Sequence, residues 1–398
     1  MPTLQKSTRI RENYISFGCD PELFFTDSKG KVIGAEKVIP KDGLEVRSRP
    51  RLYGASVPPI VINAKGVVLD GVQAELQPAP TACRANLANE IASTFWSLRE
   101  RIQEMKDVRI TFKSVVDVEL AELESLSDQA KVFGCAPSFN LYDTNAHIPV
   151  DPRTYLKRSA GGHIHMGLGW PIYLAETSGA GTTYERKQID QRQDLVHCMD
   201  ILVGNTCVML DREPLAAERR KVYGRAGEYR LPKHGLEYRT LSNFWLRAYP
   251  LFSLVLGLSR IATGIIATST GDGYYTPAPE IRSELFETVK LDRLLDAINL
   301  NDANLARQNW DSFQPYLRKY LPNGVEGATY GTLTSGTLDK FTSFLDTVME
   351  QGLETVFPED PLDHWSNLPE CHVGGWETFF NAFRPPTKVL VPDIQVQA

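Results

Sequence analysis

The sequence predicts an α+β fold, with strands concentrated in the first part of the chain and helices in the last part. Short runs of β-branched and aromatic residues come first, and Gly, Pro and Asp-Gly separate them at expected turns. Between residues 81 and 105, apolar residues recur every three or four positions, which is the period of an amphipathic helix. The segments 285–300 and 338–356 show the same helical period. We therefore expect strands and helices to be segregated along the chain.

The expected elements follow in chain order. Strands are expected at 15–25, 30–40 and 58–76, a helix at 81–105 with Thr81 as its N-cap, a strand at 161–169, a buried helix at 194–210 and a strand at 235–241. The apolar run 250–268 is interrupted by Ser253, Ser259 and Arg260. It therefore predicts a buried helix rather than a membrane span.

The composition excludes several classes of protein. With 42% hydrophobic residues among 398, the chain can bury a sizeable core. The net charge of −6 argues against bulk binding to nucleic acid or to an anionic membrane, because both favour a basic surface. The six cysteines show no CxxC pairing, and the first residues lack the apolar core of a secretory signal. We expect a reduced, cytoplasmic protein.

Polar residues occur in pairs, two positions apart, inside segments that otherwise resemble buried strands. The pairs are Asp20 and Glu22, Glu75 and Gln77, His163 and His165, and Glu237 and Arg239. Side chains two apart on a strand point to the same face, so each segment would project two ligating groups from one side of a sheet. Four such pairs on one sheet would form a site for a divalent metal and phosphate.

The acidic pairs and the histidine pair also have other interpretations. Asp20-Pro21 could open a turn with Glu22 solvated, although an acidic residue recurs in a similar context at Glu75. The glycines before His163, Gly161 and Gly162, would allow close approach of a ligand. Paired histidines also occur in zinc hydrolases, so this motif does not choose the metal.

An arginine-rich stretch lies between residues 211 and 230. Its cations are Arg212, Arg219, Arg220, Lys221, Arg225 and Arg230. Guanidinium groups bind phosphate and carboxylate bidentately, so the stretch suits a triphosphate. The alternative is a solvated loop in which neighbouring acidic residues neutralise the arginines. The sequence contains no GxxxxGK[ST] motif, so any ATP site must be of another kind.

The order of these motifs resembles a known family. The motifs GCDPELF, AELQPAP, GGHIHMG, YGRAGEYR and GLEYR are similar to those of the phage-type carboxylate-amine ligases, the COOH-NH2 ligases of type 2, over roughly residues 14 to 250. These amidoligases belong to the glutamine synthetase and glutamate-cysteine ligase superfamily. The resemblance implies a curved antiparallel sheet of the glutamine synthetase type with packed helices. It also implies a catalytic domain at 1–275, a helical region at 276–398 packed on the same globule, and a location in the host cytoplasm if a phage encodes the chain.

The resemblance implies an ATP-dependent ligase. In that superfamily ATP phosphorylates a carboxylate to an acyl phosphate, which an amine attacks to give an amide and phosphate, with Mg²⁺ or Mn²⁺ holding the nucleotide. Carried over motif by motif, the implied metal ligands are Glu22, Glu75, His163 and Glu237, with Asp20 as a further candidate. Arg239 would contact the acyl phosphate, His165 would lie near the nucleotide phosphates, and Arg220, Arg225 and Arg230 would bind phosphate oxygens. Asp20 and Glu237 are the candidate general bases.

One departure leaves the number of metals open. The superfamily often has a further acidic residue shortly after the second-strand glutamate, whereas here no acid follows Glu75 until Glu90, and Gln77 could complete the coordination. The expected substrates are small-molecule or peptide carboxylates and amines, with a nucleic acid as a candidate that the net charge does not favour. Arg47, Arg49, Arg51 and Tyr53 could form a recognition loop or a solvated one. The rival functions are a zinc hydrolase, a guanidino kinase and a catalytically inactive binding protein.

Overall fold

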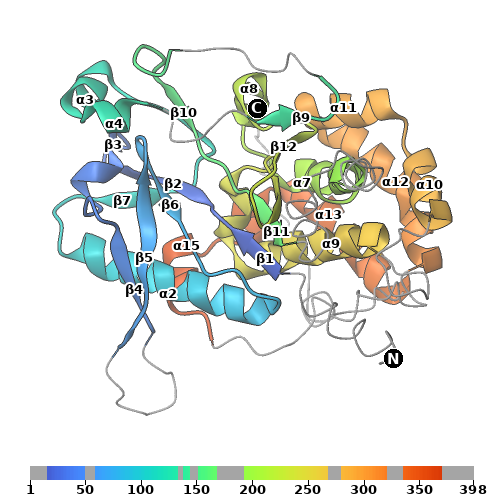
Figure 1. Cartoon of the computed structure of the whole chain (residues 1–398), viewed down its shortest axis with the longest axis horizontal. Helices are drawn as coiled ribbons and strands as arrows, with labels where there is room; N and C mark the ends of the chain where they lie inside the picture. Colours follow the sequence, from blue (N-terminus) through green and yellow to red (C-terminus); the bar gives the residue numbers. More distant parts are fainter. Residues whose placement is uncertain are drawn as a thin grey trace, which may run out of the picture.

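The computed structural model describes residues 16–49, 59–132, 138–143, 151–167, 192–267, 279–320 and 335–369. Most strands of the first 120 residues lie on one side of the molecule, and the helices that follow residue 192 lie largely on the other (Figure 1). All strand pairs are antiparallel. The predicted α+β class is confirmed, and the glutamine synthetase type of the sheet stays a prediction.

A five-stranded sheet lies at the centre of the molecule. Its order is β1 (Ser16–Cys19), β11 (Ile164–Gly167), β13 (Gly235–Tyr238), β12 (Glu228–Arg230) and β9 (Phe139–Asn140). The register pairs His165 with Glu237 and Glu237 with Arg230. Because directly paired residues share a face, these three side chains lie in one row across the sheet.

A second sheet is built from earlier segments. It contains β3 (Val32–Ile33), β2 (Glu22–Thr26), β6 (Gln73–Leu76), β5 (Val61–Asp70) and β4 (Leu44–Arg47) in that order, with β7 (Arg109–Thr111) also paired to β2. The register places Glu22 directly opposite Glu75. A separate two-stranded sheet joins β8 (Val115–Asp117) to β10 (Lys157–Ser159).

The chain passes from the first sheet to the second at Asp20 and Pro21. The strand predicted over 15–25 is therefore two strands in different sheets, and the prediction that all four polar pairs lie on one sheet is wrong. Pro21 has no N–H to donate, which favours a break in strand pairing at this position. The Pro21 carbonyl accepts from the Leu76 amide at 2.9 Å, so the two sheets meet here.

Helix α2 (Arg84–Gln103) covers the second sheet with the apolar face that its period predicts. Its N-cap is Cys83, so the prediction of Thr81 is wrong by two residues. The Thr81 hydroxyl instead accepts a hydrogen bond from the Cys83 amide at 3.1 Å. Near the second sheet lie η1 (Ala35–Lys37), α3 (Leu120–Ser125) and α4 (Asp128–Lys131). The short α15 (Pro361–Ser366) packs on α2, where Trp365 stacks on Phe95.

A buried helix lies behind the five-stranded sheet, as predicted for 194–210. Residues 192–199 continue through a π-helical turn, η2 (Asp200–Gly204), into α7 (Asn205–Leu210). The short α8 (Ala216–Val222) and η3 (Asn243–Arg247) flank β12 and β13 in the sequence.

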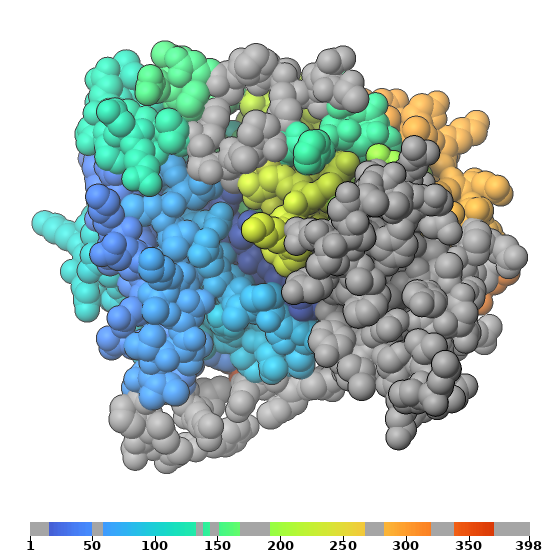
Figure 2. Space-filling view, viewed as in Figure 1, coloured from blue at the N-terminus to red at the C-terminus, as the bar shows by residue number. Residues whose placement is uncertain are grey.

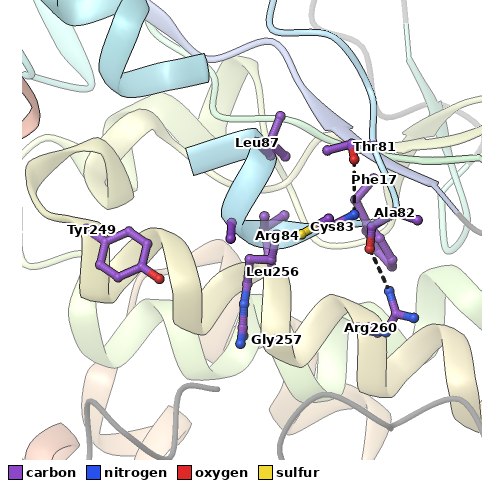
Figure 3. Close-up of a pocket in the computed structure, with 11 residues that line it drawn as sticks. Phe17, Thr81, Ala82, Cys83, Arg84, Leu87, Tyr249, Leu256, Gly257 and Arg260 are labelled. Atoms are coloured by element: carbon purple, nitrogen blue, oxygen red, sulfur yellow. Dashed lines mark hydrogen bonds between the residues drawn. The ribbon is translucent and has the colours of Figure 1, made fainter. Parts of the chain in front are cut away.

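Helix α9 (Tyr249–Ala267) is long and apolar enough to cross a membrane. However, 83% of its apolar segment Tyr249–Ile266 is buried inside the protein. The helix packs against α10, η2 and η3, and against α2, whose first turn lies beside it in Figure 3. This burial agrees with the predicted core helix.

The C-terminal helices are shorter than predicted. The segment 285–300 is divided between α10 (Pro279–Thr288) and α11 (Leu291–Asn299), and α12 (Ala303–Tyr320) follows. The segment 338–356 breaks between α13 (Ser335–Gln351) and α14 (Leu353–Val356), where Gly352 adopts a φ of 79°. Helix α12 packs on α7, and Asn309 donates to Asn205 at 2.8 Å. The domain boundary at residue 275 stays a prediction.

Candidate active site at the junction of the two sheets

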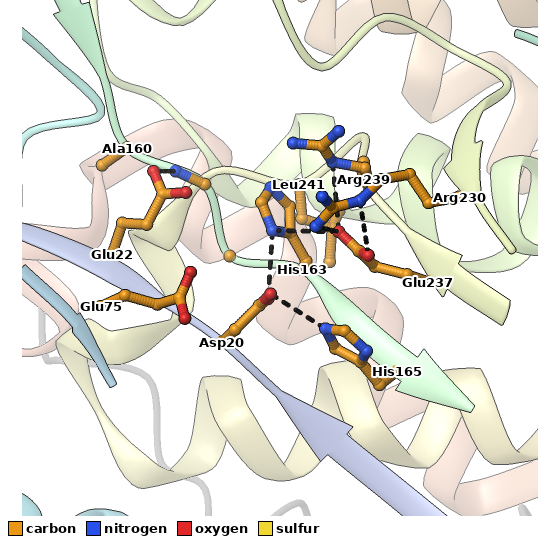
Figure 4. A network of polar contacts seen from close by, with 12 residues as sticks. Asp20, Glu22, Glu75, Ala160, His163, His165, Arg230, Glu237, Arg239 and Leu241 are labelled. Atoms are coloured by element: carbon orange, nitrogen blue, oxygen red, sulfur yellow. Dashed lines mark hydrogen bonds and ion pairs between the residues drawn. The ribbon is translucent and has the colours of Figure 1, made fainter. Parts of the chain in front are cut away.

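The predicted polar residues converge where the two sheets meet (Figure 4). Asp20 lies in the connection, Glu22 and Glu75 face each other on the second sheet, and His165 and Glu237 do so on the first. The earliest described residues, dark blue in Figure 2, are recessed between the lighter blue region and the yellow-green segment around residue 230. Residues far apart in the sequence thus form one polar junction.

Asp20 lies between the two histidines of the GGHIH motif. Its Oδ1 is 3.0 Å from His163 Nδ1, and its Oδ2 is 3.0 Å from His165 Nε2. These atoms are close but are not aligned as hydrogen bonds. Burial opposes ionisation, but the positive charge that both histidines can carry lowers the pKa of Asp20 well below its usual range. The carboxylate is therefore ionised at neutral pH.

Glu237 is buried and held by two arginines. Arg230 donates from Nε to Oε2 at 2.7 Å and from Nη2 to Oε1 at 2.6 Å, which is a bidentate pair. Arg239 Nε lies 3.2 Å from the same Oε1. A buried carboxylate is stable in such surroundings because its charge is paired and hydrogen-bonded.

His163 lies beside Asp20 and is fully buried. Burial lowers the pKa of its ring, although the neighbouring Asp20 charge opposes this. Its Nδ1 faces Asp20 and also lies 3.6 Å from Glu237 Oε1. Its Nε2 contacts the hydroxyl of Tyr223, to which Arg239 Nη2 donates at 2.9 Å. Both ring nitrogens of His163 therefore face protein groups.

Tyr223 is a site residue that the sequence interpretation missed. Its ring is contacted by two buried guanidinium groups, with Arg219 4.7 Å and Arg239 5.0 Å from the ring centroid. The available signal was its position inside the arginine-rich stretch, directly before Gly224.

The two glycines of the GGHIH motif allow neighbouring groups of the protein to pack closely against the backbone. A Cβ on Gly161 would overlap the His163 ring, and a Cβ on Gly162 would overlap the Ser242 carbonyl and Trp245 Nε1. The prediction that these glycines admit a ligand is therefore replaced by an intramolecular role.

Among the described residues, two groups of acidic and histidine side chains have ligand atoms that, within each group, all lie within 4.8 Å of one another. The first, here called the His165 group, comprises Asp20, His165 and Glu237. The second, the Glu75 group, comprises Glu22, Asp70 and Glu75. His165 is more accessible than His163, with 19% of its side chain exposed, and its Nδ1 lies 3.1 Å from His234 Nε2.

Glu22 and Glu75 of the Glu75 group accept hydrogen bonds from amides. Glu22 Oε2 accepts from the Gly161 amide at 2.7 Å and from Gln73 Nε2 at 3.1 Å. Glu75 Oε1 accepts from Gln77 Nε2 at 2.8 Å. Burial and then the Asp70 charge raise the pKa of Glu22 well above its usual range. Burial and then the Asp20 charge raise the pKa of Glu75 to about 8.

Asp70 is the second residue that the sequence interpretation missed. It ends β5, five residues before Glu75, the residue that pairs with Glu22. Its Asp-Gly sequence was interpreted only as a turn. Asp70 supplies an acid beside Glu75, although no acid follows Glu75 in the sequence until Glu90. Gln77, the predicted substitute, donates to Glu75.

Two of the predicted phosphate-binding arginines lie outside this junction. Arg220 is buried and donates from Nη1 to the carbonyls of Gly224 at 2.9 Å and Thr240 at 3.3 Å. This geometry gives Arg220 a structural role in place of the predicted phosphate contact. Arg225 lies 3.5 Å from Asp143, with 30% of its side chain exposed.

The predicted recognition loop has other partners. Arg47 lies 3.7 Å from Glu45, and Arg49 donates to Asn89 and to the Leu368 carbonyl. Arg51 and Tyr53 lie outside the described residues. The two described arginines therefore contact groups outside the polar junction.

Residues 186–274 match a family model described as "Phage phiEco32-like COOH.NH2 ligase-type 2". The predicted resemblance to the type 2 carboxylate-amine ligases is confirmed for this segment, and for the motifs that precede residue 186 it stays a prediction. The matched ligase segment contains Tyr223, Arg230, Glu237 and Arg239. Asp20, Glu22, Glu75, His163 and His165 precede it in the sequence, and the fold brings them against it.

No curated protein matches the chain. Among solved structures, the chain is similar to a bifunctional glutathione synthetase from Pasteurella multocida, with 10% sequence identity and a TM-score of 0.42 over 91% of this chain. The alignment covers 49% of that protein, so this chain spans about half of its length.

Proposed function

We propose that this protein is an ATP-dependent carboxylate-amine ligase that forms an amide through an acyl phosphate at a divalent-metal site. The observation that carries the proposal is the meeting of the His165 group and the Glu75 group beside Arg230 and Arg239 of the matched ligase segment. Carboxylates for cations and guanidinium groups for phosphate are the parts that phosphoryl transfer needs.

The donor atoms of both groups fit divalent cations. The Glu75 group offers only carboxylate oxygens, which Mg²⁺ prefers. The His165 group adds a ring nitrogen, for which Mn²⁺ is the alternative occupant. The raised pKa values of Glu22 and Glu75 have a physical cause, burial beside like charges, that a bound cation would offset. Bound metal would neutralise phosphate charge and orient the nucleotide.

We assign the nitrogen ligand to His165 rather than to the predicted His163. His163 is fully buried, and its Nε2 contacts the Tyr223 hydroxyl, whereas His165 is partly exposed at the junction. His163 would then support its neighbour Asp20, because its Nδ1 lies 3.0 Å from Asp20 Oδ1.

Arg230 and Arg239 would bind the transferring phosphoryl group. Arg230 and Arg239 already hold a buried anion, Glu237, and a phosphoryl oxygen beside it would meet the same donors. Their charge persists at any working pH.

Asp20 is the better placed of the two candidate bases. Its side chain is 14% exposed, whereas that of Glu237 is 2% exposed. Asp20 is ionised and would accept a hydrogen bond that orients the incoming amine, although its low pKa makes it a weak base. The proposed substrates are small-molecule or peptide carboxylates and amines.

The proposal is tested first by binding. Calorimetric titration of metal-stripped protein with a non-hydrolysable ATP analogue should show binding that requires Mg²⁺ or Mn²⁺. Pools of carboxylates are then supplied with ATP and hydroxylamine, which converts an acyl phosphate into a hydroxamate. Hydroxamate formation together with phosphate release supports the ligase. ATP-independent hydrolysis by a zinc-loaded protein, or a stable phosphorylated product without phosphate release, would replace it with a hydrolase or a kinase.

A further inference from the structure

His234 lies next to His165 at the edge of the polar junction. Its Nε2 is 3.1 Å from His165 Nδ1, and the centroids of the two rings are 5.2 Å apart. His234 is exposed, and it belongs to neither the His165 group nor the Glu75 group. Its contact with a candidate metal ligand therefore has no role in the proposed function so far.

The backbone places His234 at this position. Residues 231–234 join β12 to β13, and the Gly235 amide closes the turn by donating to the Pro232 carbonyl at 3.0 Å. Gly235 begins β13 and pairs with Gly167 of β11, the strand that carries His165. Because Pro232 has a fixed φ and Gly235 is held in the sheet, the turn presents His234 beside that strand.

The two nitrogens of His165 face different groups. Nε2 lies 3.0 Å from Asp20 Oδ2 (Figure 4), whereas Nδ1 faces His234. A neutral imidazole carries one N–H, so a metal bound through the lone pair of Nε2 leaves the proton on Nδ1. That N–H needs an acceptor, and His234 Nε2 lies at hydrogen-bonding distance.

We propose that His234 is a positioning residue for the metal of the His165 group. His234 Nε2 accepts a hydrogen bond from His165 Nδ1–H, which fixes the tautomer and the ring orientation that direct the Nε2 lone pair of His165 towards the cation. Such a partner also makes the ligating nitrogen more basic. This inference rests on the proposed metal site and adds a residue to it.

The effect should be limited to the His165 group. The Glu75 group offers only carboxylate oxygens, and His234 is not one of its members. Loss of His234 should therefore weaken a cation that is bound through nitrogen and should leave a cation at the Glu75 group unchanged. This difference separates positioning of His165 from a general loss of structure.

The test follows nitrogen-bound Mn²⁺ in the metal-stripped full chain, without nucleotide. Pulsed electron paramagnetic resonance detects a nitrogen bound directly to Mn²⁺, so it reports the His165 group even when Mn²⁺ also occupies the Glu75 group. His165→Gln should abolish the nitrogen signal. His234→Leu should raise the Mn²⁺ concentration that gives half of this signal by about tenfold. We expect this lower end of the usual loss because water can accept from Nδ1 but does not fix the ring.

Two further variants make the test specific. His234→Gln should restore most of the affinity, because its amide oxygen can accept from His165 Nδ1. Lys233→Leu, at an exposed position of the same turn, should behave as wild type. Thermal stabilisation of His234→Leu by Mg²⁺ should also equal that of wild type, which shows that the variant is folded and that its Glu75 group is intact.

The outcomes separate this inference from the proposed function. A wild-type protein that binds no Mn²⁺ would remove the metal site and the role of His234 with it. A nitrogen signal that His234→Leu leaves at the wild-type concentration would overturn the role of His234 alone, and the ligase proposal would stand. A loss in His234→Leu that His234→Gln does not restore, or a nitrogen signal that survives in His165→Gln, would also overturn the inference.

Discussion

The His165 group and the Glu75 group lie side by side, but the protein compensates their charges differently. Asp20 and Glu237 of the first group contact histidines and arginines, and the pKa of Asp20 is lowered. Glu22 and Glu75 of the second group receive hydrogen bonds from amides, and the pKa values of both are raised. The difference arises from the neighbouring charges, since all four carboxylates are largely buried.

This difference separates two physical roles. In the His165 group, cationic side chains already hold the carboxylates in position, so the group is preorganised without metal. In the Glu75 group, ionisation brings like charges together in a buried space, and a divalent cation would relieve that cost. We therefore expect the Glu75 group to dominate metal affinity and the His165 group to dominate phosphoryl transfer.

Glu237→Gln should have the largest effect. The exchange leaves Arg230 and Arg239 facing a neutral amide and removes one ligand of the His165 group. Ligase turnover should fall by about 10²- to 10³-fold, the usual loss when one preorganised group of an active site is removed. Steady-state phosphate release measures the effect. Glu45→Gln, at an exposed site on β4, is the matched control. A Glu237→Gln enzyme with wild-type turnover would remove the proposed role.

Glu75→Gln should separate stability from metal binding. At neutral pH Glu75 is largely protonated in the folded protein and ionised in the unfolded chain, so a permanently neutral Gln should raise the melting temperature of the metal-free protein, and a gain of about 1 kcal/mol would correspond to a few degrees. The stabilisation by Mg²⁺ should be lost at the same time. Thermal melts with and without Mg²⁺ measure both effects.

Glu90→Gln is the control for that experiment, because Glu90 lies nearby but accepts from the Ala79 amide at 2.8 Å and lies outside the Glu75 group. It should leave the Mg²⁺ response intact. A Glu75→Gln protein that Mg²⁺ stabilises as strongly as wild type would refute the division of roles between the groups.

The pH dependence of metal-free stability should report the Glu75 group. The folded-state pKa of Glu75, about 8, is above its ordinary value of 4.5, so the folded protein binds more protons than the unfolded chain between these values. The contribution of Glu75 to stability is therefore present below pH 4.5 and is lost as the pH rises towards 8, by up to about 1.4 kcal/mol per pH unit.

Chemical denaturation between pH 5 and 8 measures this slope by comparing wild type with Glu75→Gln. Saturating Mg²⁺ should reduce the difference in slope, because the metal replaces the proton, and Mg²⁺ affinity should rise with pH. An Mg²⁺ affinity that falls over this range would contradict the assignment.

Tyr223→Phe should have the smallest effect on activity. It removes the hydroxyl that contacts His163 and Arg239 but keeps the ring beside the two guanidinium groups. Because Tyr223 acts through His163, which lies beside the candidate ligand Asp20, we expect kcat to fall by about tenfold, the lower end of the loss for such a supporting residue. Tyr238→Phe is the control, because its hydroxyl donates to Asp200 on the opposite face of the sheet at 2.6 Å. It should cost stability, about 1 kcal/mol or more, without lowering kcat. Equal losses of kcat in both variants would indicate a purely structural role for Tyr223.

Local signals predicted much of the site. Period-two spacing placed carboxylates and histidines on common faces, and the fold brings Asp20, Glu22, Glu75, His165 and Glu237 together. The same signals did not reveal Asp70, because an aspartate before glycine is equally typical of a turn. The same signals predicted phosphate binding for both Arg220 and Arg230. Of these two, Arg230 contacts the site carboxylate Glu237, whereas Arg220 donates to a backbone carbonyl.

The sequence by itself determined the α+β class, the amphipathic faces of the helices and the polar residues that share a strand face. These properties depend on the spacing of neighbouring residues and on backbone geometry. Only the tertiary structure decided that the strands belong to two sheets, that Asp20 connects them and that Glu22 faces Glu75. Strand pairing joins residues far apart in the chain, and the pKa of a buried carboxylate depends on which charges that pairing places beside it.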